Sequence, residues 1–185
     1  AAPGGKTCHL LEIQPELKKL VAVELEQQRM QRVRENLQRL KLDAELIVAD
    51  ATECSTWWDG ESFDRILVDV PCSASGVIRR HPDIKSLRRE EDLPSLAQTQ
   101  QKILQQAWQM LAPGGLLLYV TCSVFKQENE AQISKFLSEQ DDADDVIIDA
   151  SWGMSCKHGR QILPGEDDSD GFYFACVRKG LDSSI

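Results

Sequence analysis

The sequence has no apolar run close to the roughly 20 residues that a membrane-spanning helix needs. Its first residues also lack the basic stretch and following apolar stretch of a secretory signal peptide. Internal repeats and low-complexity linkers are absent as well. The chain has 185 residues, of which 42% are hydrophobic and 28% charged. This composition predicts one ordinary domain, residues 1–185, with enough apolar side chains for a core, and we expect it to be monomeric.

Cysteine spacings typical of zinc sites are missing too. No C-x-x-C pair occurs and no histidine stands at zinc-finger spacing, so we predict no metal site. Free thiols fit a reducing, cytoplasmic setting best. Four of the six cysteines are interpreted as small buried apolar residues, the common role of a free cysteine: Cys8, Cys54, Cys156 and Cys176.

Basic residues are outnumbered by acidic ones. The chain has 21 Lys and Arg against 30 Asp and Glu, a formal net charge of −9, which argues against a broad phosphate-binding surface. The acid is concentrated in residues 139–145 and 166–170, which we interpret as solvated loops. The base is concentrated in Arg79-Arg80-His81 and in Lys85, Arg88 and Arg89.

Strand and helix patterns alternate along the chain, which predicts an α/β fold with a mostly parallel, doubly wound sheet. The residues from Ser73 to Glu91 form a long polar loop, a type that is usually functional or mobile. Helices are predicted at Gly5 to Glu12, Glu26 to Leu40, Leu93 to Leu111 and Lys126 to Leu137. Strands are predicted at Leu20 to Val23, Glu45 to Ala49, Ile66 to Val68, Leu116 to Val120, Val146 to Ile148 and Phe172 to Val177.

Two cysteines follow apolar strands directly. Cys72 lies in Asp69-Val70-Pro71-Cys72-Ser73, and Cys122 lies in Thr121-Cys122-Ser123. The carboxyl ends of parallel strands meet at one edge of the sheet, where α/β proteins place their chemistry. We therefore expect both thiols at one edge, one of them near the carboxylate of Asp69, in an arrangement suited to covalent catalysis.

Three successive predicted strands end in an acidic residue, Glu24, Asp50 and Asp69, and a glycine-rich turn is also present. Glu24 could accept hydrogen bonds from ribose hydroxyls and Asp50 from an adenine amino group, although a single acid at such a place is more often a turn or cap residue. The turn is Ala1-Ala2-Pro3-Gly4-Gly5-Lys6-Thr7, which lets a ligand approach the backbone. An alternative is a Walker A loop of a nucleotide hydrolase, since Gly5-Lys6-Thr7 matches its end.

The motifs AAPGGKT, VAVE, IVADAT, DVPCSASGVIRRHPDIK, PGGLLLYVTCS and DSDGFYFACV follow one another across nearly the whole chain. In this order they resemble the RNA 5-methylcytosine methyltransferase family. The segment RRHPDIK and the ending LPG…DGF resemble its bacterial members more than its eukaryotic nucleolar ones. The resemblance implies a Rossmann-like class I methyltransferase fold, S-adenosyl-L-methionine as methyl donor and a cytosine of 16S ribosomal RNA as substrate.

The resemblance also implies a role for each candidate residue. Ala1 to Lys6 would hold the methionine part of the cofactor, with Glu24 at the ribose, Asp50 at the adenine and Asp69 near the methyl donor and the target base. Cys122 would attack the base and Cys72 would assist product release. For Arg79, Arg80 and His81 we predict contacts with RNA phosphates, whereas Lys85, Arg88 and Arg89 fit an ordinary charged helix start equally well.

Three alternatives stay open from the sequence. DNA cytosine-5 methyltransferases place their nucleophile at the Pro-Cys position, which is Cys72 here. A non-catalytic RNA-binding scaffold could keep the same fold. Finally, Ala1 to Lys6 is typical of a turn that follows a strand, so we expect the first strand of the sheet, and an N-terminal RNA-binding region, to precede Ala1 in a longer protein.

Overall fold

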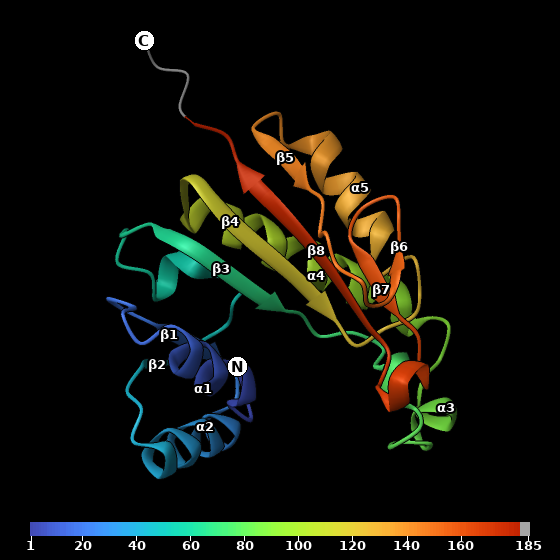
Figure 1. Cartoon of the computed structure of the whole chain (residues 1–185), viewed down its shortest axis with the longest axis horizontal. Helices are drawn as coiled ribbons and strands as arrows, with labels where there is room; N and C mark the ends of the chain where they lie inside the picture. The colour runs from blue at the N-terminus through green and yellow to red at the C-terminus, as the bar shows by residue number, and fades with distance from the viewer. Residues whose placement is uncertain (182–185) are drawn as a thin grey trace. The chain divides into compact units, whose positions relative to one another are not determined.

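Figure 1 shows a computed structural model of the chain, which describes residues 1–181. The chain divides into two compact units, Ala1–Asp59 and a second unit from Gly60 onward. Helices and strands alternate through much of both units, as the apolar patterns predict. Within the described residues no helix combines the length and the apolar character that crossing a membrane requires.

The first unit pairs two parallel strands with two helices. Glu24 lies opposite Val48, so these strands end side by side. One side of the long helix carries Met30, Val33 and Leu37, which pack with Cys8 in a small core. The elements of this unit are α1 (Gly5–Ile13), β1 (Val21–Glu24), α2 (Gln27–Leu40), β2 (Glu45–Val48) and a 3₁₀ turn (Cys54–Thr56).

The second unit is a six-stranded sheet with two long helices. Its strand order is β3-β4-β8-β7-β6, with β5 also paired to β8; β3 and β4 are parallel, and β8 is antiparallel to β4. The elements are β3 (Phe63–Asp69), a 3₁₀ turn (Ser75–Val77), α3 (Ile84–Leu87), α4 (Asp92–Met110), β4 (Leu111–Thr121), α5 (Glu130–Glu139), β5 (Ala143–Val146), β6 (Met154–Ser155), β7 (Arg160–Ile162), a second 3₁₀ turn (Glu166–Asp168) and β8 (Phe172–Lys179).

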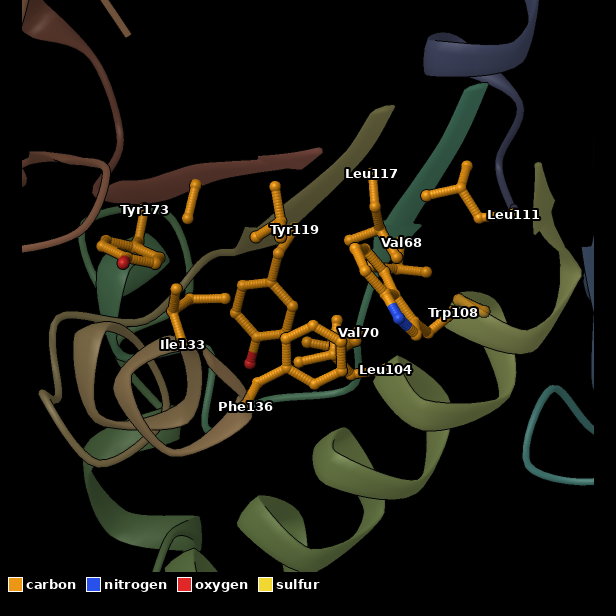
Figure 2. Packing of buried hydrophobic residues seen from close by; sticks show 13 residues of the cluster. Val68, Val70, Leu104, Trp108, Leu111, Leu117, Tyr119, Ile133, Phe136 and Tyr173 are labelled. Atoms are coloured by element: carbon orange, nitrogen blue, oxygen red, sulfur yellow. The ribbon is translucent and has the colours of Figure 1, made fainter. Parts of the chain in front are cut away.

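The main core lies between this sheet and helices α4 and α5. Figure 2 shows Trp108 of α4 and Phe136 of α5 meeting the inward side chains of the strands, among them Tyr119 of β4. The rings of Trp108 and Phe136 are 5.1 Å apart and nearly perpendicular. Every second residue of β8 is buried against the helices, since strand side chains alternate between faces. This packing fixes β4, and therefore the position of its carboxyl end.

Several predicted element boundaries are wrong. The helix expected from Lys126 begins at Glu130, because Asn129 has non-helical dihedral angles and its side chain bonds to residues inside the unit. The last acidic residues of 139–145, Asp144 and Asp145, belong to strand β5 (Ala143–Val146) rather than to a solvated loop. This strand pairs only with β8 and lies at the edge of the sheet, so its acidic side chains can face solvent. The strand predicted at Val146 to Ile148 therefore ends at Val146. The long polar loop after Ser73 contains the short turn Ser75–Val77 and helix α3.

Candidate active site

The thiols of Cys72 and Cys122 are in contact. Their Sγ atoms lie 3.4 Å apart, within hydrogen-bond distance for sulfur. The parallel register of β3 and β4 produces this, because Asp69 lies opposite Val120 and the chain then continues past both strand ends. A backbone hydrogen bond from Val70 to Val120 extends the pairing one residue further. Cys72 is buried and Cys122 half-buried, so Cys122 is the more accessible of the two.

The neighbourhood of Cys72 keeps that residue in its thiol form. Its pKa is raised well above the ordinary value, first by the hydrogen bond with Cys122, then by burial, and further by the charges of Cys122 and Glu128. A thiolate is the form that attacks carbon, so the group that holds its proton more firmly is the poorer nucleophile. The hydrogen bond with Cys122 is thus the largest of the effects that keep the proton on Cys72.

Asp69 is the last residue of β3, three residues before Cys72. Its side chain is exposed, and its strand partner Val120 is two residues before Cys122. The two thiols therefore meet at one edge of the sheet, as predicted, and Asp69 ends the strand that leads to Cys72. Cys8 and Cys54 are buried as predicted, whereas Cys156 and Cys176 are half-buried, and burial raises the pKa of both.

The turn after Cys72 is tied to β4 and β8 through two glycines. The N–H of Gly76 donates to the carbonyl of Cys122 at 2.8 Å, and the N–H of Gly171 donates to the carbonyl of Gly76, also at 2.8 Å. The backbones are so close that a Cβ on Gly76 would lie 2.1 Å from the carbonyl oxygen of Gly171. Neither glycine stood out in the sequence, since the contact joins segments nearly a hundred residues apart.

Replacing Gly76 with alanine is expected to push these three segments apart. The clash is with main-chain atoms that have no rotamer to change, so we expect a loss of roughly 3 kcal/mol in the free energy of unfolding, at the upper end for overpacking. Gly5→Ala is the matched control for stability, since a Cβ there meets nothing within 4 Å. Denaturant unfolding of both variants measures the difference, and equal stabilities would contradict the close approach.

A buried polar cluster, which the sequence did not predict, lies behind the two cysteines. Glu128 has an exposed fraction of 0% and Ser73 of 1%. The Glu128 carboxylate accepts hydrogen bonds from Ser73, Ser123 and Gln100. In the sequence Glu128 reads as a polar residue of an exposed helix start, and no local pattern distinguishes it.

The basic stretch is partly paired with acid. Arg79 donates to the carboxylate of Asp168 and to the carbonyl of Ser169, and Arg80 forms an ion pair with Asp170. Residues 166–170 are therefore not simply a solvated loop as predicted, because two of their carboxylates meet arginines. His81 is exposed.

The side chain of Arg88 makes hydrogen bonds within the protein. Its guanidinium donates to the carbonyls of Ser73 and Cys72, at 3.0 and 3.5 Å, and so supports the turn that carries Cys72. A cavity of about 530 Å³ lies beside this turn. Its lining combines apolar side chains with basic ones, and includes Ile78, Leu93, Val124, Phe125, Lys85, Arg88 and Arg89.

All of the candidate cofactor residues except Asp69 belong to the first unit. Glu24 is buried, and its Oε2 atom accepts hydrogen bonds from the N–H of Ala2 at 2.9 Å and the amino group of Ala1 at 3.0 Å. The glycine-rich turn is thus held against the end of β1. Gly4 has a φ of 102° and its Cβ would press on Val33 of α2, so this position requires glycine. Gly5 opens α1 and faces open space.

Asp50 follows β2, next to the end of β1. Its Oδ1 accepts hydrogen bonds from the N–H and the hydroxyl of Thr52, each at 2.8 Å. This is the turn role that the sequence left open for a single acid. Lys6 and Thr7 lie in the first turn of α1.

Acid is expected to destabilise the first unit through Glu24. Burial alone would raise the pKa of its carboxyl, but hydrogen bonds donated by the backbone N–H groups of Ala2 and Glu26 act against burial, and the pKa lies below the ordinary 4.5. The carboxylate therefore stabilises the folded state above the unfolded-state pKa, and this contribution disappears as the pH falls through the lower, folded-state pKa.

Thermal unfolding of the chain and of Glu24→Gln across that pH range tests this expectation. The two melting temperatures should differ most near neutral pH and converge in acid. A difference that stays constant with pH would show that ionisation of Glu24 contributes nothing. Glu45→Gln is a suitable control, because Glu45 is an exposed carboxylate of the same unit.

The residues described include no group of three or more His, Cys, Asp or Glu side chains placed to hold a metal ion.

Comparison with known proteins identifies the fold and the family. The chain is 54% identical over 181 residues to a Ribosomal RNA small subunit methyltransferase B of Shewanella oneidensis, covering 97% of the chain and 41% of that protein. It is 54% identical over 179 residues to the protein of the same name from Vibrio cholerae, covering 97% of the chain and 40% of the relative. The chain thus spans about two fifths of the length of these relatives.

Among solved structures, the crystal structure of NSun6 from Pyrococcus horikoshii with SFG superposes with a TM-score of 0.87 at 27% identity, covering 98% of the chain and 47% of that protein. The fold is therefore the Rossmann-like fold of S-adenosylmethionine-dependent methyltransferases. The family model described as 16S rRNA methyltransferase RsmB/F matches residues 1–178, nearly the whole sequence. This family, rather than a P-loop nucleotide hydrolase, accounts for both thiol motifs and the glycine-rich turn: the chain belongs to the RsmB/F family of 16S rRNA methyltransferases.

Proposed function

We propose that the protein transfers a methyl group from S-adenosyl-L-methionine to C5 of a cytosine in 16S ribosomal RNA, through a covalent bond between Cys122 and C6 of the base. The observation that carries this proposal is the 3.4 Å contact between two thiols at neighbouring strand ends, in a chain of an rRNA methyltransferase family. Such a substrate fits the cytoplasmic setting expected for free thiols. Residues 1–185 would serve together as the catalytic domain.

The first unit has the groups that the methyl donor requires. Ala1 to Lys6 with the open position at Gly5 would face its methionine part, Glu24 its ribose and Asp50 its adenine. The Glu24 carboxylate has about four lone-pair sites, so hydroxyl donors can join the bonds already made by the turn. When bound, S-adenosylmethionine supplies an electrophilic methyl group.

Cys122 makes C5 of the base reactive. Its thiolate sulfur forms a bond to C6, and the electrons of the C5–C6 double bond become available at C5, which can then take the methyl group. Asp69, at the end of the adjacent strand, would donate a hydrogen bond from its carboxyl group to N3 of the ring, which favours the addition of the thiolate to C6. The greater exposure of Cys122 compared with Cys72 supports this assignment over the arrangement of the DNA enzymes.

Cys72 would act after methyl transfer. Once Cys122 is bound to carbon it carries no charge and no proton-accepting thiolate, so the largest cause of the raised Cys72 pKa is removed. Cys72 can then lose its proton to solvent and take the proton from C5. The electrons of the C5–H bond restore the C5–C6 double bond, and Cys122 leaves as a thiolate.

RNA binding is proposed for Arg79, Arg80 and His81, next to the turn that carries Cys72. Changing both arginines to glutamate in the full-length protein is expected to weaken RNA binding and to lower the slope of log affinity against log salt by about 2, one for each arginine. Asp168→Asn with Asp170→Asn is the matched variant, since it frees the arginines and should strengthen binding. Unchanged affinity across the salt series would contradict the contact.

The proposed function is tested directly with the full-length protein, unmodified 16S RNA and S-adenosylmethionine labelled in the methyl group. Digestion to nucleosides should give labelled 5-methylcytidine. Label in a different nucleoside would contradict the C5 chemistry, and the absence of labelled RNA together with ATP hydrolysis would favour the nucleotide hydrolase. RNA binding without any transfer would favour the scaffold.

A further inference from the structure

The Glu128 carboxylate is bonded to both of the turns that carry the cysteines. Ser73, which follows Cys72, donates its N–H to Oε1 at 2.8 Å and its hydroxyl to Oε2 at 2.6 Å. Ser123, which follows Cys122, donates its hydroxyl to Oε2 at 2.5 Å. One carboxylate therefore joins two Cys-Ser pairs that are fifty residues apart in the sequence.

Other residues hold Glu128 itself in place. Gln100 of α4 donates to Oε1 at 3.1 Å, and the hydroxyl of Tyr119 donates to the Glu128 carbonyl at 2.7 Å. The hydroxyl of Ser75 lies 3.1 Å from those of Ser73 and Ser123, which closes the cluster. Glu128 thus accepts hydrogen bonds from α4 and from both cysteine turns at its carboxylate, and from β4 at its backbone carbonyl.

A buried carboxylate is costly to a fold, because it loses its hydration. Glu128 is fully buried, and apolar packing would connect the two turns without that loss. What a carboxylate adds is direction: its oxygens fix the positions of donors to within a few tenths of an ångström. The residues directly before Ser73 and Ser123 are Cys72 and Cys122, whose Sγ atoms are in contact.

We propose that Glu128 is a positioning residue, which holds Cys72 and Cys122 at contact distance through Ser73 and Ser123. The proposal rests on the proposed function only for its effect on catalysis. The geometric part, that the carboxylate sets the separation of two thiols, can be tested without RNA or cofactor.

Two variants of Glu128 separate its charge from its shape. Oε1 faces two N–H donors, whereas Oε2 faces two hydroxyls, which can also accept. In Glu128→Gln the amide oxygen can replace Oε1 and accept from the N–H donors, and the NH₂ group can replace Oε2 and donate to the hydroxyls. The geometry is therefore retained and only the charge is lost. Glu128→Ala removes the acceptor and leaves the donors without a partner.

The geometric test uses phenylarsine oxide, a trivalent arsenical that binds two thiols together. Each sulfur forms a bond to arsenic, and the arsenic oxygen leaves as water with the two thiol protons. The full-length protein and Glu128→Gln should bind the reagent equally, and Glu128→Ala about tenfold more weakly or not at all. Cys72→Ala gives the background from the other cysteines. Equal binding by Glu128→Ala and the unchanged protein would overturn the proposal.

The catalytic test measures kcat, KM and the pH dependence of product release for full-length variants. Glu128→Ala should lose roughly 100-fold in kcat, as expected for a displaced catalytic group, with an unchanged KM for S-adenosylmethionine. Around Cys72 lie the titratable or charged groups of Cys122, Glu128, Tyr119 and Arg88. Glu128→Gln removes only the negative charge of Glu128, which raises the pKa of Cys72. The pH profile of product release should therefore move to lower pH.

The outcomes distinguish the two proposals. If the unchanged protein makes no 5-methylcytidine but Glu128→Ala loses arsenical binding, the proposed function fails and the positioning role stands. If both variants unfold at lower temperature yet keep kcat, pH profile and arsenical binding, Glu128 only stabilises the fold, and the positioning role is wrong.

Discussion

Replacing Cys122 with alanine is expected to reduce methylation by roughly 10⁴-fold or more, the loss typical for removal of a catalytic nucleophile. Without a sulfur at this position no bond to C6 forms, and C5 of cytosine remains a poor nucleophile. The small cavity left by the thiol should have little effect on folding, since Cys122 is only half-buried. Initial rates with labelled S-adenosylmethionine and unmodified 16S RNA measure the loss in the full-length protein.

Cys176→Ala is the matched control for this substitution. Cys176 is also half-buried, but it lies in the middle of β8, opposite Leu118 of β4 and away from the strand ends. Its removal should leave the rate within a few-fold. If Cys122→Ala kept its activity and Cys72→Ala lost it, the nucleophile would be Cys72, as in the DNA enzymes.

Replacing Cys72 with alanine is expected to give a different result, a trapped covalent complex. Cys122 can still attack C6 and C5 can still take the methyl group, but the base that removes the C5 proton is missing. Elimination then stalls, and a protein–RNA band that survives denaturing gel electrophoresis should accumulate over tens of minutes. The band should contain the methyl label, because trapping follows transfer.

The double variant Cys72→Ala with Cys122→Ala should form no such band. A band in the double variant would show that another nucleophile makes the bond. A Cys72→Ala protein that turned over normally would show that release needs no second thiol. Loss of Cys72 also removes the hydrogen bond between the two thiols, so the rate of adduct formation should be measured separately from its accumulation.

Much of the site could be predicted from local sequence patterns. The apolar runs before Asp69 and Cys122 identified two parallel strands, and parallel pairing alone brings their ends together. Glu24 and Asp50 followed from the same rule in the first unit, where their strands are neighbours. These positions depend on strand endings, which the alternation of apolar runs and turn residues marks clearly.

The supporting contacts could not be predicted, because each joins residues distant in the sequence. Glu128 reads as an exposed helix residue until the fold brings it to Ser73, and the approach of Gly76 to Gly171 has no local signal. The acidic residues of β5 misled the prediction for a related reason. An edge strand needs apolar side chains on one face only, and its pairing with β8 outweighs its polar composition.

The contact between Cys72 and Cys122 has a consequence for the redox behaviour of the protein. Two thiols 3.4 Å apart need move little more than an ångström to reach the roughly 2.05 Å of a disulfide bond. A mild two-electron oxidant such as diamide would take up the two electrons and two protons of these thiols, and the nucleophile and the release group would be lost in one step. A thiol reductant would return both. Under the proposed function, the methylation rate is therefore expected to fall after treatment with diamide and to return after treatment with a thiol reductant.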